Sequence, residues 1–326
     1  MHAQRNSPSK VTAFYKVFNE ADFLKESIAS IYEYADKIVV FEYCLDSMRK
    51  VIRQDRVTKD GLSTDGTTEI VKSFPDPENK IEHCPVGFIW GAESIPYQMI
   101  VDSIEVGDYA WVVDGDIVYP DAVAKRIRGL CDEGGSDVIW VPERVFFHDV
   151  YTEIWSWLTH HQRVFRKQSE VSFYFPTCFE VHWLEAWAGK DWRWYGREAI
   201  CDWGGGEVYK THTLDVDAGE VAHHYAVVRS HQRNLEKFLW QYEMIDKRWN
   251  SSARGVCRQF GRDALDFKLK THHYFLNHEQ ESLRPYNGSH PEAMAGNKWM
   301  DYKWDWKSVN MSYAEALKLV GEPSLC

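Results

Sequence analysis

The sequence lacks several features that would assign it at once to a class of protein. No apolar run approaches the length of a membrane span, and the first ten residues, MHAQRNSPSK, lack the apolar core of a secretion signal. The seven cysteines form an odd set without a CxxC pair, which is typical of a reduced chain. We therefore expect a cytoplasmic protein without a membrane span.

Positive charge is also scarce. The chain has 38 Lys and Arg residues against 49 Asp and Glu, which gives a formal net charge of −11. This balance disfavours a broad surface that follows nucleic-acid phosphates. Low-complexity tracts and internal repeats are absent, and the hydrophobic fraction of 44% is that of a globular protein. Its 326 residues suffice for one large domain with an extension, or for two domains.

Strands and helices are predicted to alternate over the first 135 residues. Short apolar runs predict strands at residues 11–17, 37–43, 81–84 and 109–113. Helices are predicted after Asn19, which can act as a cap, from the turn at 63–65 to about 74, over 92–104, and from Pro120 onward. This rhythm predicts an α/β fold with a mainly parallel sheet and helices on both faces.

The pattern changes after residue 136. Residues 137–147 and 161–167 are predicted to be strands of a mixed part of the sheet, and 230–249 an amphipathic helix. The remainder, 251–326, is polar, aromatic and weakly periodic, and we interpret it as a C-terminal extension packed on the main domain of residues 1–250.

The segment WVVDGDIVYP, residues 111–120, is the most informative part of the sequence. A short apolar run ends in two carboxylates, Asp114 and Asp116, with one glycine between them. Such a run predicts a buried strand, and ligands of open α/β sheets bind beyond the carboxyl ends of the strands. Two acids there favour Mg²⁺ or Mn²⁺ that also carries a substrate phosphate.

Four segments, taken in order, resemble the family-2 glycosyltransferases of the GT-A fold. They are FYKVFNEADFL with Asn19 and Glu20, DGLSTDGTTEI at 60–70, the Asp-Gly-Asp at 114–116, and HHYAVVRSHQRNLEK at 223–237. The resemblance covers residues 11–245. It implies a Rossmann-like GT-A sheet, with a nucleotide-sugar-binding half over 1–135 and an acceptor-binding half over 136–250.

By this resemblance the chain is a metal-dependent enzyme that moves a sugar from a nucleotide diphosphate sugar, with a UDP-sugar favoured, to an acceptor hydroxyl. Transfer is expected to invert the anomeric centre by direct displacement. The acceptor would be a glycan, a protein or a small molecule, and the acidic balance disfavours nucleic acid. The metal, Mn²⁺ or Mg²⁺, would be held by Asp114 and Asp116 with one of His223 and His224; we favour His224.

The resemblance also implies a set of donor-binding residues. They are Asn19, Glu20, Glu42, Asp65, Asp114, Arg229 and Lys237. The identity of the acid that binds the base stays open between Glu42, Asp60 and Asp65. In typical members the turn follows the second strand almost directly, whereas here residues 43–59 lie between them.

A direct displacement needs a base that deprotonates the acceptor hydroxyl. Three acids in the second half are candidates, and the sequence does not choose between Glu180, Glu198 and Asp202. Arg163 and Arg166 resemble a recurrent Arg-x-x-Arg strand, to which we assign no role at this point.

Other classes of function fit parts of the sequence. Asp114 after an apolar run also matches the nucleophile of haloacid-dehalogenase-type phosphohydrolases, although that strand is normally the first of the fold. The many aromatic residues (15 Trp, 17 Tyr and 16 Phe) fit a non-catalytic carbohydrate-binding protein. A nucleotidyltransferase is less favoured, because KVFNEADFL lacks the glycine-rich phosphate loop of that class.

Overall fold

The computed structural model describes residues 9–45, 54–89, 99–100, 102–147, 149–167, 193–195, 198–202, 208–226, 228–229, 233 and 283–303. The predicted helix over 230–249 and most of that over 92–104 lie outside these ranges, as does the proposed boundary at residue 250. The division into domains therefore stays a prediction.

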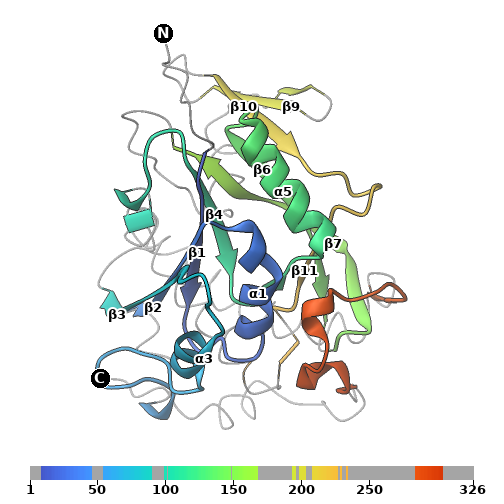
Figure 1. Cartoon of the computed structure of the whole chain (residues 1–326). Helices are drawn as coiled ribbons and strands as arrows, with labels where there is room; N and C mark the ends of the chain where they lie inside the picture. Colours follow the sequence, from blue (N-terminus) through green and yellow to red (C-terminus); the bar gives the residue numbers. More distant parts are fainter. Residues whose placement is uncertain are drawn as a thin grey trace, which may run out of the picture.

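A large sheet runs through the molecule in the strand order β3-β2-β1-β4-β7-β6-β10-β9-β8 (Figure 1). The strands are β1 Val11–Val17, β2 Lys37–Leu45, β3 Ile81–Ile89, β4 Tyr109–Asp114, β5 Ile117–Val118, β6 Val138–Phe146, β7 Thr152–Arg166, β8 Arg193–Tyr195, β9 Glu198–Asp202, β10 Val208–Thr213, β11 Ala222–His224 and β12 Leu283–Pro285. Neighbours among β1 to β4 pair in parallel, whereas β7 is antiparallel to both β4 and β6. The predicted α/β class, with a parallel half and a mixed half, is confirmed.

Helices cover the sheet as its alternating apolar residues require. Among the described residues, the helices with defined bounds are α1 Leu24–Ile31, α3 Thr67–Ser73 and α5 Asp121–Glu133, with 3-10 turns η1 Tyr32–Tyr34, η2 Gln54–Arg56, η3 Glu292–Met294 and η4 Lys298–Met300. Ile28 and Ile127 pack with Tyr15 on one face of the sheet, while Phe14 packs with Ile100 on the other. None of the described helices is long and apolar enough to cross a membrane.

Two predicted helix starts are wrong in detail. Asn19 does not cap α1, whose N-cap is Phe23. Asn19 has φ +54°, and its side-chain amide binds the backbone of Arg56 and Thr64 instead. Pro120 is the N-cap of α5 rather than a residue of its first turn. The reason at Asn19 is that residues 20–23 intervene between it and the helix, so its side chain is too far from the first turn.

The strand order creates a switch point between β1 and β4. The chain adds β2 and β3 on one side of β1 and then crosses to place β4 on the other side. At such a point the loops after neighbouring parallel strands diverge and leave a crevice at their carboxyl ends. Here those loops begin at residues 18 and 115, so the Asn19-Glu20 and Asp114-Gly-Asp116 segments border the same crevice.

The segment before α3 packs tightly on a bulge of β3. Gly61 and Gly87 have φ +85° and +80°, and a Cβ on Gly87 would lie 2.3 Å from the carbonyl oxygen of Asp60. The register of β2 and β3 shifts at the same place, between Glu42 and Tyr43. This contact fixes where residues 57–63 enter the crevice.

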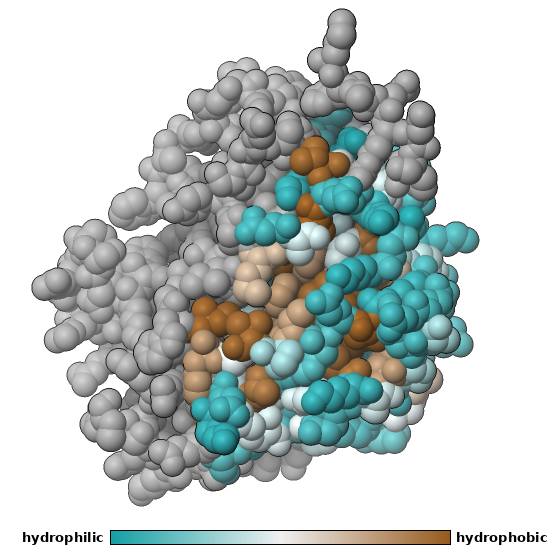
Figure 2. All heavy atoms as spheres, turned by 60° about the vertical axis from the view of Figure 1, so that its left-hand side comes forward, coloured by the Kyte–Doolittle hydropathy of each residue, from teal (hydrophilic) through white to brown (hydrophobic). Residues whose placement is uncertain are grey.

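The face of the molecule drawn in Figure 2 mixes polar and apolar side chains. In Figure 2 hydrophilic residues make up the right-hand side of the described part, with hydrophobic ones between them toward the middle. The most exposed large hydrophobic residues described, Val86, Met99, Val106 and Tyr151, come from separate elements.

Gly87→Ala should destabilise the fold more than Gly134→Ala. Both positions have positive φ, which costs an alanine about 1 kcal/mol, but only at Gly87 would the Cβ also collide with backbone. We expect an additional loss of roughly 1–3 kcal/mol for Gly87→Ala in urea unfolding. Equal losses in the two variants would contradict the tight contact between residue 60 and β3.

Candidate functional site

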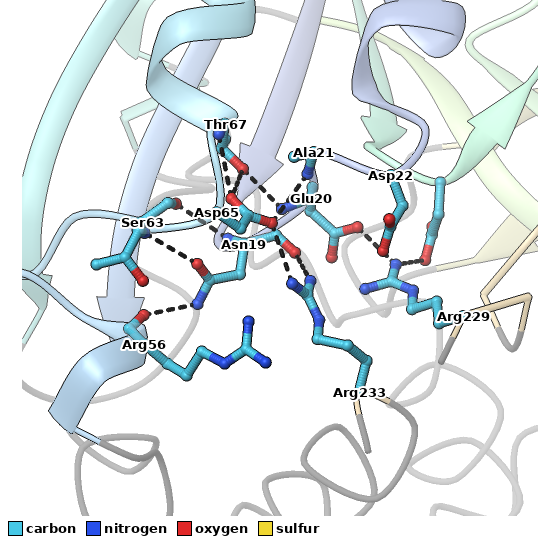
Figure 3. Close-up of polar contacts among 12 residues, drawn as sticks. Asn19, Glu20, Ala21, Asp22, Arg56, Ser63, Asp65, Thr67, Arg229 and Arg233 are labelled. Atoms are coloured by element: carbon cyan, nitrogen blue, oxygen red, sulfur yellow. Dashed lines mark hydrogen bonds and ion pairs between the residues drawn. The ribbon is translucent and has the colours of Figure 1, made fainter. Parts of the chain in front are cut away.

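The candidate site lies where β1 and β4 end and is closed by a strand from far along the chain. The short strand β11 pairs with β5 on one side, with His224 opposite Ile117, and with β6 on the other, with His224 opposite Val145. This pairing sets the His223-His224 pair beside the residues that follow Asp116. Arg229 and Arg233, a few residues later, reach back to the β1 loop (Figure 3).

Charged side chains of alternating sign connect the ends of these strands. Asp114 Oδ2 accepts a hydrogen bond from Arg163 Nη1 at 2.8 Å, and Arg163 Nε donates to Glu143 Oε1 at 2.5 Å. The other oxygen of Glu143 lies 3.0 Å from His224 Nδ1, within ion-pair distance although not aligned as a hydrogen bond. Glu143 and Arg163 are buried, so each depends on the other to offset its desolvation.

The series continues across the switch point to the β1 loop. His224 Nε2 lies 3.3 Å from Asp116 Oδ1, and Arg229 Nη2 donates to both Asp116 Oδ2 and Glu20 Oε2, each at 2.6 Å. Asp116 and Arg229 are both buried. We call the whole set the charge chain; its members are Asp114, Arg163, Glu143, His224, Asp116, Arg229 and Glu20.

The charge chain fixes the protonation states of its members. Burial alone would lower the pKa of His224, but Asp116 and Glu143 outweigh it and raise that pKa to about 9. Burial alone would raise the pKa of Glu143, yet Arg163, His161 and His224 lower it below its ordinary value. At neutral pH the imidazole of His224 is therefore a cation between two carboxylates.

The two acids after β4 differ in exposure. The carboxylate of Asp114 is 35% exposed, whereas that of Asp116 is 3% exposed. Burial raises the pKa of Asp114, but Arg163 and Lys16 outweigh it and keep that pKa below its ordinary value. Gly115 lets the β1 loop pack closely against this turn, because a Cβ there would lie 3.0 Å from Cβ of Glu20.

The two adjacent histidines face different surroundings. His224 points to Asp116, whereas His223 lies in an aromatic cluster, with its Nδ1 3.3 Å from the hydroxyl of Tyr225 and its ring 5.2 Å from that of Phe146. Burial lowers the pKa of His223 well below its ordinary value, so it stays neutral there. The geometry puts His224, the residue favoured from the sequence, beside the acids.

A second group of contacts ties the β1 loop to the turn before α3. Asn19 donates to the carbonyl of Arg56 and accepts from the amide of Thr64, while the amide of Glu20 donates to Thr67 Oγ1 at 2.8 Å. Asp65 accepts from the amide of Ala21 and from Thr67. Figure 3 shows these residues converging beside Glu20.

Arg233 closes this group from the other side. Its guanidinium lies 3.2 Å from Asp65 Oδ2 and also donates to the carbonyl oxygen of Asn19 (Figure 3). The sequence motif pointed to Arg229 and Lys237 in this segment; Arg233 lies between them and was missed. Lys237 itself lies outside the described residues.

Glu42 is an anchor beneath the site. It is fully buried, and its carboxylate accepts from the amide of Ser63, from Thr68 Oγ1 and from His83 Nε2, at 2.8–2.9 Å. Burial alone would raise the pKa of Glu42, but the hydrogen bonds from His83 and Ser63 lower it to about 2. Because both oxygens bind the protein, we do not retain Glu42 as the acid that reads a base.

The two proposed catalytic bases that the structure describes are not brought to this site. Glu180 lies outside the described residues. Glu198 and Asp202 lie on β9, which pairs with residues 208–210 of β10, while 211–213 pair with the first residues of β6. Their backbone therefore extends past the amino end of β6, opposite the end where His224 pairs with Val145 (Figure 1). The base stays unassigned.

Two members of the charge chain had no distinct signal in the sequence. Glu143 is a lone acid within an apolar strand, and Arg163 belonged to a pattern without an assigned role. A charged residue inside a buried strand is itself a signal, because it needs a partner of opposite sign. The partner's identity depends on the pairing of β4, β6 and β7, which the sequence does not give.

The residues present fit a divalent cation in part. The described residues hold no cluster of three or more His, Cys, Asp or Glu side chains that could bind a metal. Asp116 Oδ1 and His224 Nε2, however, are 3.3 Å apart, close to the roughly 3 Å between neighbouring ligands of one octahedral ion. Arg229 donates to the other carboxylate oxygen of Asp116, and Glu143 lies beside the other ring nitrogen of His224. Contacts of this kind orient metal ligands from outside the coordination shell.

Comparisons with known proteins show a likeness of structure only. No protein-family model matches the chain, and no curated protein matches it by sequence. Crystal structures of S. aureus TarS 1-349 match with 12% identity and a TM-score of 0.35 alone, 14% and 0.35 in complex with UDP, and 13% and 0.32 in complex with UDP-GlcNAc. Each match covers 83% of this chain and 75–77% of the TarS chain. At TM-scores this low, the likeness carries no argument about the site.

Glu42→Gln should remove a pH-dependent part of the stability. A pKa lowered from 4.5 to about 2 corresponds to about 3 kcal/mol, present above pH 4.5 and lost as the pH falls toward 2. The variant should be less stable than the wild type in urea at neutral pH, and this difference should shrink below about pH 4.5. The exposed Glu133→Gln is the control; a constant difference for Glu42→Gln would contradict the anchor.

Proposed function

We propose that the protein is a glycosyltransferase that uses a nucleotide diphosphate sugar. The observation that carries the proposal is the position of the charge chain: it lies at the switch point of the parallel sheet, where Asp114, Asp116 and Glu20 meet. Ligands of open α/β sheets bind there. The order of the four sequence motifs adds the donor class, and the GT-A fold belongs to the same proposal.

The charge at the site supports a divalent cation as part of the donor complex. The charge chain has four carboxylates and three cations, counting His224 as protonated before an ion binds. Lys16 adds one positive charge beside Asp114, so the net charge of these eight groups is zero. The neighbouring pair Asp65–Arg233 is neutral as well. These described groups alone therefore offer a diphosphate no excess positive charge without a bound cation.

In the proposal, Mn²⁺ or Mg²⁺ would be held by Asp116 Oδ1 and by Nε2 of His224, which must give up its proton to bind the ion, with Asp114 beside it. When bound, the ion neutralises the diphosphate and stabilises it as a leaving group. The protein's own part is to hold the two ligands in place: Arg229 orients Asp116, and Glu143 orients His224. The proposal assigns contact with the nucleoside to Asp65 and the turn at 63–67, with the exposed Asp60 as the alternative acid that binds the base.

Finer features of the proposal come from the sequence resemblance. They are a UDP-sugar as donor, inversion by direct displacement, a hydroxyl of a glycan, protein or small molecule as acceptor, and a cytoplasmic location. A phosphohydrolase with Asp114 as nucleophile is less favoured, because that carboxylate is bound by Arg163 and its strand is the fourth of the fold.

The wild-type protein should be stabilised by nucleotide diphosphates only when a divalent cation is present. At a ligand concentration of 100 times Kd, binding to the native state adds about 2.7 kcal/mol, enough to raise Tm by several degrees. UDP, GDP and TDP would be compared with and without Mn²⁺ by thermal unfolding. Stabilisation by free monosaccharides but by none of the nucleotides would point to a carbohydrate-binding protein instead.

Asp116→Asn should abolish the effect of Mn²⁺. The amide has the size of the carboxylate but no charge, so the cation loses its buried anionic ligand. We expect loss of the Mn²⁺-dependent rise in Tm and a fall in sugar transfer or donor hydrolysis of about 100-fold or more. Asp132→Asn, at an exposed ion pair on α5, is the control. Unchanged transfer at saturating Mn²⁺ would contradict the proposed site.

A further inference from the structure

A segment near the end of the described chain packs against the loop that carries Glu20. We call residues 290–300 the C-terminal clip. It contains η3 and η4 and follows β12, which pairs with β7 through Arg284 opposite Glu153. Figure 1 shows this segment, drawn in orange-red, beside β7 and below β11. More than 250 residues separate it from the β1 loop in the sequence.

The clip is held at its start by a cluster around β12. The carboxylate of Glu153 is buried and lies 2.7 Å from Arg144 Nε and 2.5 Å from Arg284 Nε. Arg144 also stacks over the ring of Tyr286, 4.8 Å from its centroid. At the far end of the clip, the hydroxyl of Tyr151 donates to the carbonyl oxygen of Met300.

Between these two anchors the clip contacts the β1 loop directly. Asn297 is buried and donates from Nδ2 to the carbonyl oxygen of Asp22 at 3.1 Å, while Lys298 Nζ lies 2.7 Å from Asp22 Oδ1. The ring of Trp299 stacks on that of Phe23 with centroids 6.3 Å apart. Asp22 and Phe23 are thus held by three successive residues of the clip.

The held residues adjoin the charge chain on both sides. Glu20, which binds Arg229, is two residues before Asp22, and Figure 3 shows Asp22 beside Arg229. Phe23 stacks on Tyr225 at 5.0 Å, and Tyr225 is the neighbour of His224. The hydroxyl of Tyr225 lies 2.8 Å from Nδ1 of His290 in the clip. One aromatic stack therefore connects the clip to the loop with Glu20 and to the strand with His224.

We propose that the C-terminal clip is a positioning element of the donor site: by fixing Asp22 and Phe23 it holds Glu20 where Arg229 can bridge it to Asp116. The name donor site rests on the proposed function, whereas the coupling between clip and loop does not. Asn297 is the positioning residue of greatest interest, because its amide both caps η4 by accepting from the amide of Trp299 and donates to the loop.

Asn297→Asp separates these two tasks. The carboxylate can still accept from the amide of Trp299, but it cannot donate to the carbonyl of Asp22 and it repels the carboxylate of that residue. We expect faster hydrogen exchange at the amides of Glu20 and Ala21, which bind Thr67 and Asp65, with exchange in β1 unchanged. Loss of one such hydrogen bond should weaken binding of UDP with Mn²⁺ about two- to tenfold.

The matched control is Asn79→Asp, the same substitution at an exposed position between α3 and β3. It should change neither the exchange at Glu20 and Ala21 nor the affinity. Trp299→Ala should speed exchange and weaken binding as Asn297→Asp does. Trp299→Phe should stay closer to the wild type in both measurements, because it keeps a ring against Phe23.

The outcomes separate the two proposals. Unchanged exchange at Glu20 and Ala21 in Asn297→Asp overturns the coupling, whether or not the wild type binds a nucleotide. Faster exchange with unchanged affinity overturns the positioning of the donor site. If the wild type binds no nucleotide diphosphate with Mn²⁺, the proposed function fails, and hydrogen exchange still decides whether the clip holds the loop.

Discussion

The site depends on the pairing of buried charges across the switch point. Four carboxylates, three of them buried or nearly so, gather at the ends of these strands. Without cations between them, desolvation and mutual repulsion would make this arrangement unstable. Arg163, His224 and Arg229 lie between them, so each acid meets a cation. The acids at the ends of β1 and β4 come from residues 20–116 and these cations from residues 163–229, so neither part of the chain can form the site alone.

The parallel half of the fold could be predicted because its signals are local. Short β-branched runs bounded by turn residues gave β1, β2 and β4 with nearly their observed ends, and β4 carried its acids to the carboxyl end. The pairing of strands far apart in the sequence could not be predicted. From the sequence, the alternation of side chains along a strand did not decide which of the two adjacent histidines faces the acids. The pairing of β11 with β5 and β6 turns His224 toward Asp116 and His223 into the aromatic cluster.

The role of Glu42 shows why position along a strand is a weak guide to function. It lies near the end of β2, where a ligand-binding acid is expected. Residues 63–68 fold back over it, however, and supply the amide of Ser63 and the hydroxyl of Thr68, while His83 comes from β3. A buried carboxylate with that many donors is most stable as an anion bound to the protein, so it shapes the turn at 63–67 from beneath.

The aromatic residues illustrate a different limit of sequence reasoning. Their number fitted a carbohydrate-binding protein, and no periodicity ordered those after residue 250. In the structure Phe23, Tyr225, Phe146 and Trp299 form a stack that reaches from the C-terminal clip to both sides of the charge chain. Flat rings in contact resist sliding more than flexible aliphatic chains do, because few rotamers fill the same space. A site whose charges must stay within hydrogen-bonding distance needs that rigidity, which explains why apolar residues so far apart in the sequence meet behind it.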